Sequence, residues 1–516
     1  MGQIMRRQAL VLCCSALLAG CTVGPDYEQP ELLLPDTWQE VAAADVVGEA
    51  PPLATWWEAF NDPLLTSLIQ RSAQESRNVV LAAARVEEAR AIRGVAKAPL
   101  FPDLILSGTY TRTRPSENGA QGQIIEAIGG EPGEVSENFQ AGFDSFWEID
   151  LWGRIRRQVE SADASLQASV EDYRDVLVTL FAEVAAAYVD VRTAQERIRF
   201  ARENVELQSE SAQLTRDRFN AGLTSALDVA QAESNLANSS AQIPTLEFEL
   251  EQAKNRLSVL VGVNPGTLED VLAEPTGIPI PDPTVAEVLP AELLRRRPDI
   301  RGAERRLASQ TALIGARKAE LYPSFSLAGV LELVSGNSSD FFTGESTQWT
   351  LVPGVRWTLF SGGRIRNQIR VEEARTARAL AGYEQSVLLA LEEAENSLVG
   401  LQRTRVRRER LTVAVDATQR AVELVRTQYL SGLTNFQNVL DSQRSLFDQQ
   451  DQLAVTEGNA VQALIALNKA MGGGWDVDAV EAMAASATQQ ADSVRAGAQL
   501  PGTAETGSNT SGSGGS

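Results

Sequence analysis

The sequence predicts an α+β membrane protein made of two tandem structural repeats. Three observations predict this fold class. The motif Gly153–Arg156 recurs as Gly363–Arg366, 210 residues later. Each copy is preceded by two stretches with the alternating pattern of β-strands. Each is followed by a proline-free stretch with helical periodicity. Self-similarity over such a distance indicates two copies of one architecture within the 516 residues.

The repeats extend beyond this motif and differ by one insertion. Phe219–Thr224 recurs as Tyr429–Thr434 at the same spacing of 210, whereas Lys97–Pro102 and Lys318–Pro323 are 221 residues apart. The difference of 11 falls between the motifs that bracket the strands, so the first hairpin has the longer loop. The expected segments are repeat 1, a proline-rich connection and repeat 2, over residues 64–262, 263–297 and 298–475.

Residues 1–20 have the form of a lipoprotein signal peptide. Arg6 and Arg7 precede an apolar run, 9–19, that is too short to span a membrane as a helix. The run ends in Leu-Ala-Gly before Cys21, which resembles the lipobox of bacterial lipoproteins. We expect Cys21 to carry the lipid (palmitate-type acylation), and Thr22 to favour export to the outer membrane. The alternative is an ordinary secretory signal with a chance cysteine.

Composition argues against several classes of function. The formal charge is −22, which disfavours nucleic acid as a partner. The chain has no histidine, the commonest general base and zinc ligand, and no phosphate-binding Gly-Lys-Ser/Thr element. We therefore expect no enzymatic activity, no metal and no cofactor. Cys13 and Cys14 leave with the signal, so the mature chain cannot form an internal disulfide.

Four strands are expected after an extended N-terminal arm at 21–63 and a helix at 64–98. Their ranges are about 103–113, 138–151, 324–334 and 348–360. The second is the clearest, because apolar and aromatic residues such as Phe139, Phe143 and Trp147 alternate with polar ones. Strands of about ten residues suit a tilted crossing of an outer membrane.

Two helices of unusual length follow the hairpins, at 154–220 and 364–430. The first carries an apolar heptad and spans roughly 100 Å; the second has a looser seam, interrupted by Arg408. Return helices are expected at 226–261 and 436–471, and another at 298–319. We expect the helices at 226–261 and 298–319 to lie end to end along helix 154–220. In the same way, we expect the helices at 436–471 and 64–98 to lie end to end along helix 364–430. Residues 476–516 have the composition of a disordered tail.

Four strands cannot close a barrel, and open edges in lipid leave backbone groups unpaired. The chain must therefore oligomerise if its strands cross a membrane. Two copies would give eight strands, a barrel filled by side chains, whereas three would give twelve strands and room for a passage. The alternative is that these strands belong to a soluble sandwich.

Several motifs together resemble one family. They are Cys21–Tyr27, Trp56-Trp57 with Phe60, Asp62-Pro63, Leu289–Ile300, Trp152–Arg154, Phe325–Gly329 and Gly362–Arg364. The chain resembles the TolC-like outer-membrane factors of tripartite efflux pumps, in their lipoprotein (NodT-type) branch, over about residues 21–475.

This resemblance implies a homotrimer with a 12-stranded outer-membrane β-barrel, a periplasmic α-barrel of coiled-coil helices and a mixed equatorial belt. It implies three further partners: outer-membrane lipid, a periplasmic adaptor (membrane fusion) protein and an inner-membrane proton-driven transporter. The implied function is a passive exit channel for small molecules. The alternatives are a duct for type I protein secretion and a structural periplasmic coiled-coil lipoprotein.

The resemblance also suggests two sets of site residues. The turns Gly222-Leu223-Thr224 and Gly432-Leu433-Thr434 match the helical tips that meet the adaptor, although each is also a plain helix–helix turn. Asp416 and Glu423 lie seven residues apart on one helix face and match an acidic constriction, with Arg426 as a partner for either. The alternative is an ordinary solvated helix face.

Overall fold

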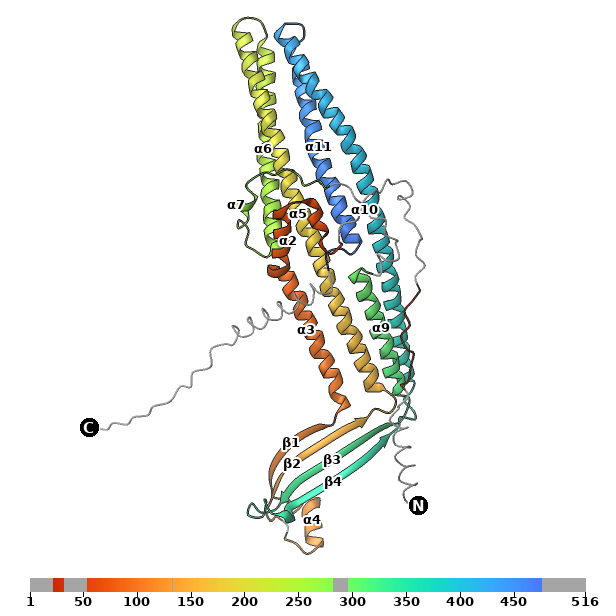
Figure 1. The fold of residues 1–516 in the computed structure, drawn as a ribbon. Coiled ribbons are helices and arrows are strands. Elements are labelled where there is room, and N and C mark those ends of the chain that lie inside the picture. The colour runs from red at the N-terminus through yellow and green to blue at the C-terminus, as the bar shows by residue number, and fades with distance from the viewer. Residues whose placement is uncertain (1–21, 32–52, 132, 282–295, 476–516) are drawn as a thin grey trace, which may run out of the picture. The chain divides into compact units, whose positions relative to one another are not determined.

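The computed structural model describes residues 22–31, 53–131, 133–281 and 296–475 (Figure 1). The chain divides into two compact units that do not coincide with the two repeats. The first contains the N-terminal arm, Val86–Asp172 and Pro298–Leu389, and the second contains most of the remainder. Each unit takes segments from both repeats, because the long helices α5 (Arg154–Asn220) and α10 (Arg364–Leu430) pass through both units.

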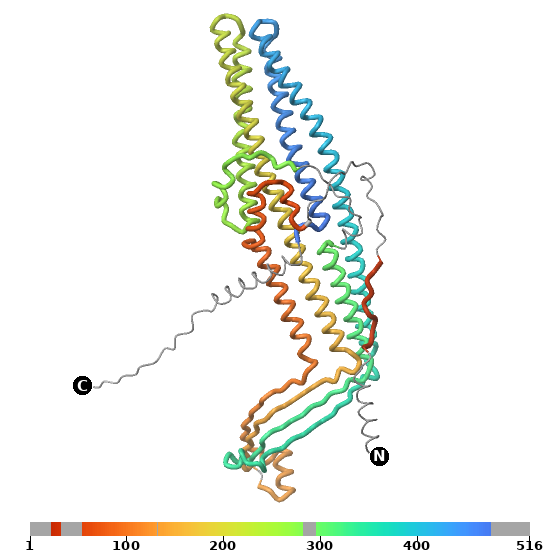
Figure 2. Tube along the Cα trace, viewed as in Figure 1, coloured from red at the N-terminus to blue at the C-terminus, as the bar shows by residue number. Residues whose placement is uncertain are grey.

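A four-stranded antiparallel sheet forms one end of the first unit (Figure 2). Its strands, in the order β1-β2-β3-β4, are Asp103–Thr113, Ser136–Ile149, Ser324–Ser335 and Thr347–Arg356. The central pairing joins the two repeats, with Trp147 opposite Leu327. Strands β1 and β4 pair on one side only within the chain. β4 ends at Arg356, earlier than expected, and the first hairpin loop contains the short helix α4 (Ala120–Ala127).

Apolar side chains of the sheet are exposed in the single chain. Leu106 of β1 is 71% exposed, and Trp349 of β4 is 73% exposed. A soluble sandwich would bury one such face against a second sheet. The described chain contains only this one sheet, so the sandwich expectation is wrong for these strands.

The helical part of the first unit packs the N-terminal arm onto α5 and α9 (Pro298–Ala319). The backbone N–H of Val23 donates to the carbonyl oxygen of Trp152 at 3.1 Å. Gly24 crosses Gly315 so closely that a Cβ on Gly24 would lie 2.4 Å from the Gly315 Cα, which requires glycine there. The buried Arg157 donates to Asp26 at 2.7 Å. The arm is therefore fixed in register from its first described residues.

The second unit contains the 3-10 helix η2 (Leu53–Phe60), α2 (Pro63–Glu75), α6 (Ala226–Val261), α7 (Glu269–Leu272) and α11 (Phe436–Ala470). Helix α3 (Arg77–Lys97) begins in this unit and ends in the first. None of the described helices combines the length and apolar composition needed to cross a bilayer.

The end-to-end helix pairs differ from those expected. Gly262, which ends α6, lies against Glu75 and Ser76 at the junction of α2 and α3. The Arg297 guanidinium, immediately before α9, donates to the carbonyl oxygen of Ala470 at the end of α11 at 3.0 Å. Helix α6 therefore meets the junction of α2 and α3, and the end of α11 meets the residue that precedes α9. The expectation that residues 298–319 continue α6 end to end was wrong, because α6 ends against the α2–α3 junction of its own repeat.

Candidate functional site

The two helical tips are built by the same local structure. Gly222 and Gly432 have φ of +73° and +75°, the left-handed region that favours glycine. The N–H of Leu223 donates to the Arg218 carbonyl at 2.8 Å, and that of Leu433 donates to the Gln428 carbonyl at 2.9 Å. These are Schellman bonds, which satisfy the last free carbonyls of α5 and α10. The turns thus follow from sequence alone.

Each return helix begins with a side-chain cap. Ser225 and Asp228 form a capping box at the start of α6, with both bonds at 3.2 Å. Thr224 also donates to the Asp228 carboxylate. Donation by Thr224, followed by the bonds from Ser225, lowers the pKa of Asp228 below its usual value. Asn435 caps α11 by accepting from the Asn438 N–H at 3.2 Å.

The leucine of each tip points away from the chain's own core. Leu223 is 66% exposed and Leu433 is 79% exposed. No side chain lies within 4 Å of a Cβ placed on Gly222 or Gly432, so the backbone of both turns is also accessible. Each tip therefore presents an exposed leucine on a capped turn.

Contacts between the two hairpins lie just behind the tips. Arg218 of α5 donates to the carbonyl oxygen of Leu430, at the end of α10, at 3.1 Å, and its guanidinium lies 4.8 Å from the centre of the Tyr429 ring. Glu210 of α5 pairs with Arg426 of α10 at 3.0 Å. Sequence reasoning missed Arg218. The sequence signal that could have identified Arg218 is that repeat 2 has Gln428 at the equivalent position.

Asp416 and Glu423 are both exposed on α10, and their side chains form no ion pair or hydrogen bond within the described part of the chain. In the single chain Arg426 turns toward α5 and pairs with Glu210 rather than with either acid. The two carboxylates are thus left free on one helix face. Cys21 lies outside the described residues.

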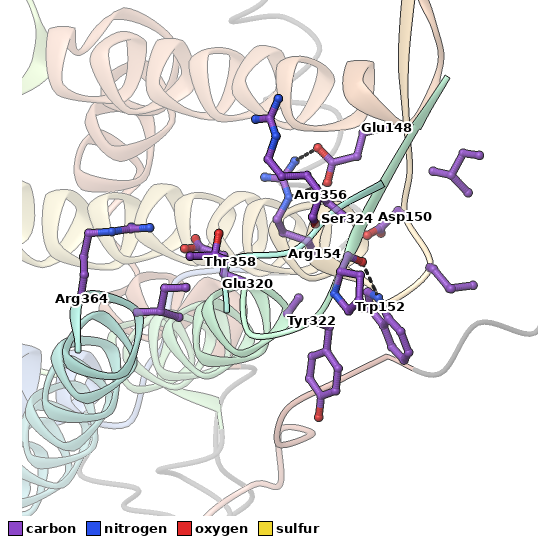
Figure 3. Close-up of a pocket in the computed structure, with 15 residues that line it drawn as sticks. Glu148, Asp150, Trp152, Arg154, Glu320, Tyr322, Ser324, Arg356, Thr358 and Arg364 are labelled. Atoms are coloured by element: carbon purple, nitrogen blue, oxygen red, sulfur yellow. Dashed lines mark hydrogen bonds and ion pairs between the residues drawn. The ribbon is translucent and has the colours of Figure 1, made fainter. Parts of the chain in front are cut away.

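A cavity of about 290 Å³ lies within the first unit, where β2, β3 and β4 meet the starts of α5 and α10 (Figure 3). Arg154 donates to both carboxylate oxygens of Glu148, at 2.9 and 2.7 Å. Trp152 donates to the carbonyl oxygen of Pro323 at 2.8 Å and stacks on Tyr322, with ring centres 4.8 Å apart. These bonds fix the strand-to-helix turn. Among the described residues, no cluster of three metal-ligating side chains occurs.

Comparison with known proteins identifies the family that has this architecture. The sequence profile of the outer membrane efflux protein family matches residues 68–263 and 289–473. Nodulation protein T of Rhizobium leguminosarum bv. trifolii is 31% identical over 463 residues, which is 90% of this chain and 96% of the relative. The pyoverdine export outer membrane protein OpmQ of Pseudomonas putida is 32% identical over 444 residues, covering 86% of this chain and 93% of the relative.

A solved structure agrees with the sequence matches. The outer-membrane channel OprN superposes with a TM-score of 0.82 at 35% identity, covering 88% of this chain and 100% of OprN. The family profile matches residues in both repeats and the superposition covers 88% of this chain, so the match is not confined to one repeat. The chain belongs to the outer membrane efflux protein family.

Proposed function

We propose that three copies of this chain assemble into a passive exit channel of a tripartite efflux system. The observation that carries the proposal is the sheet, whose strands β1 and β4 each have an unpaired edge and whose apolar side chains are exposed. Three sheets joined edge to edge would give twelve strands, satisfy every backbone edge and face the apolar side chains to lipid. Small molecules are the proposed cargo, because the P. putida relative is named for pyoverdine export.

The partners in this proposal are those that the resemblance to tripartite efflux factors implies. Leu223 and Leu433 would contact a periplasmic adaptor, which would connect the channel to a proton-driven inner-membrane transporter. A lipid on Cys21 would hold the mature N-terminus in the membrane. The docking of Val23 on Trp152, beside the start of α5, would keep that anchor close to the sheet.

The proposed constriction is formed by Asp416 and Glu423. Three copies would bring three carboxylates of each residue around one axis, where like charges attract cations and repel one another. Both groups are available because Arg426 is engaged by Glu210.

The assembly and conductance of the purified protein test the proposal. The detergent-solubilised chain should have the mass of a trimer and should form ion-conducting channels in planar bilayers. A structural spacer would give no conductance, and a stable monomer would contradict the proposal. Asp416→Ala with Glu423→Ala should reduce cation selectivity. Glu384→Ala, which removes an exposed carboxylate far from the tip on the same helix, should leave the selectivity unchanged.

A further inference from the structure

Along the four helices that lead to the tips, the buried residues change from apolar to polar and back to apolar. Within the second unit, α5 and α6 form one hairpin and α10 and α11 form the other (Figure 1). Toward the tips the buried residues are Ala212, Ala232, Tyr429, Phe436, Val439 and Leu440. Farther from the tips they are Ile198, Ala201, Leu246 and Phe447. Both clusters are apolar and contain residues of both hairpins.

On α5, α6 and α11 a polar layer lies between these clusters, beside an apolar cluster formed by Val415 and Val422 of α10 with Leu446 of α11. The polar layer consists of Gln208 and Ser211 of α5, Asn235 of α6 and Gln443 of α11, and no member is more than 4% exposed. Gln443 donates to the Ser211 hydroxyl at 2.8 Å, and Asn235 accepts from Arg444 at 2.6 Å. These two bonds join the α5–α6 hairpin to the α10–α11 hairpin.

Most of the polar side-chain atoms in the layer have no hydrogen-bond partner in the described part of the protein. Within the described chain, both amide atoms of Gln208, the amide oxygen of Gln443 and the amide nitrogen of Asn235 lack one. Buried polar groups in this condition weaken the packing around them and become fully hydrated when the packing opens. The contact among α5, α6 and α11 is therefore weaker at these side chains than at the apolar clusters on either side.

The equivalent position in repeat 2 is different. Thr418 lies 210 residues after Gln208, and its hydroxyl donates to the Gln449 side chain at 2.7 Å. The unsatisfied glutamine is therefore not a requirement of the repeat itself. Of the two equivalent positions, only Gln208 is left without a partner among the residues that the structure describes.

We propose that the polar layer is the level at which the α5–α6 and α10–α11 hairpins separate when the channel opens, and that Gln208 and Gln443 set how readily they separate. This inference rests on the proposed channel function. The closed arrangement is held by the apolar cluster at the tips and by the Glu210–Arg426 pair. Hydration of the polar layer offsets the loss of those contacts as the hairpins part, so a two-state equilibrium is biased by a few side chains.

The test replaces the two amides with apolar side chains of similar size. In Gln208→Leu/Gln443→Leu, the Tm of the purified assembly should rise and the open probability in planar bilayers should fall roughly tenfold. Thr456→Val is the matched control, because Thr456 is also buried on α11 but donates only to Gln452 of its own helix. It should leave the open probability unchanged.

Other outcomes would overturn the inference. A raised Tm with unchanged open probability would show that the layer does not take part in opening, and a lowered Tm would show that it stabilises the closed bundle. If the leucine variant fails to assemble, Tm and open probability are measured for Gln208→Met/Gln443→Met instead, because methionine adapts to irregular cores. Absence of conductance in the unaltered protein would instead contradict the proposed channel function.

Discussion

The tip leucines give the sharpest test of adaptor binding. We predict that Leu223→Asp with Leu433→Asp leaves the fold intact and strongly weakens binding. The side chains are 66% and 79% exposed, so each substitution should change the free energy of unfolding by no more than about 0.5 kcal/mol. Complete burial of a leucine contributes about 1.5–3 kcal/mol. Scaled by these exposed fractions, each leucine contributes about 1–2 kcal/mol to binding, and both contribute about 3 kcal/mol.

A loss of about 3 kcal/mol corresponds to a Kd weakened roughly 100-fold for each pair of tips. Binding of the purified adaptor is measured by surface plasmon resonance, while circular dichroism and light scattering report helix content and assembly. Leu223→Met with Leu433→Met is the control, because it keeps the apolar area and should bind within about threefold of the unaltered protein. An aspartate variant that binds as tightly as this control would refute the reasoning, and so would one that loses its assembly.

Three further predictions concern the turns and the arm. Gly222→Ala and Gly432→Ala should each destabilise the tips by about 1 kcal/mol, seen as a lower Tm, since only the positive φ disfavours a Cβ there. Because Asp228 has a lowered pKa, its cap stabilises α6 above the unfolded pKa of about 3.9 and is lost as pH falls through the lower folded value. Hydrogen exchange at the tip should show this step, and Asp228→Asn should remove it. Arg157→Met should free the arm at Asp26 for proteolysis, and an arm as resistant as in the unaltered chain would contradict this.

Local sequence signals were sufficient for the tips. A glycine after a long helical pattern, followed by a capping residue, determines where one helix ends and the next begins. The Schellman turn depends on Gly222, and the capping box depends on Ser225 and Asp228. The long helices are equally readable, because a proline-free heptad pattern has few other structures available to it.

The partners of these elements could not be read in the same way. Arg426 lies near Glu423 in sequence, yet it pairs with Glu210, which is 216 residues away. The pairing of α6 with α2–α3 also depends on tertiary packing, which helix lengths do not specify. The short helix α4 was missed because it lies in a stretch rich in glycine and polar residues, where local propensity is weak.

The internal duplication shows which of these features belong to the architecture and which belong to its use. The tip turns are the same in both repeats, as a shared helix–turn–helix requires. The residues that cross between hairpins are not: Arg218 becomes Gln428 and Glu210 becomes Arg420. When one repeat supplies the cation of a contact and the other repeat supplies its acceptor, the equivalent positions of the two repeats must carry different residues. Two sites where the repeats diverge therefore lie at contacts between the hairpins, and the proposed opening of the tip would break those contacts.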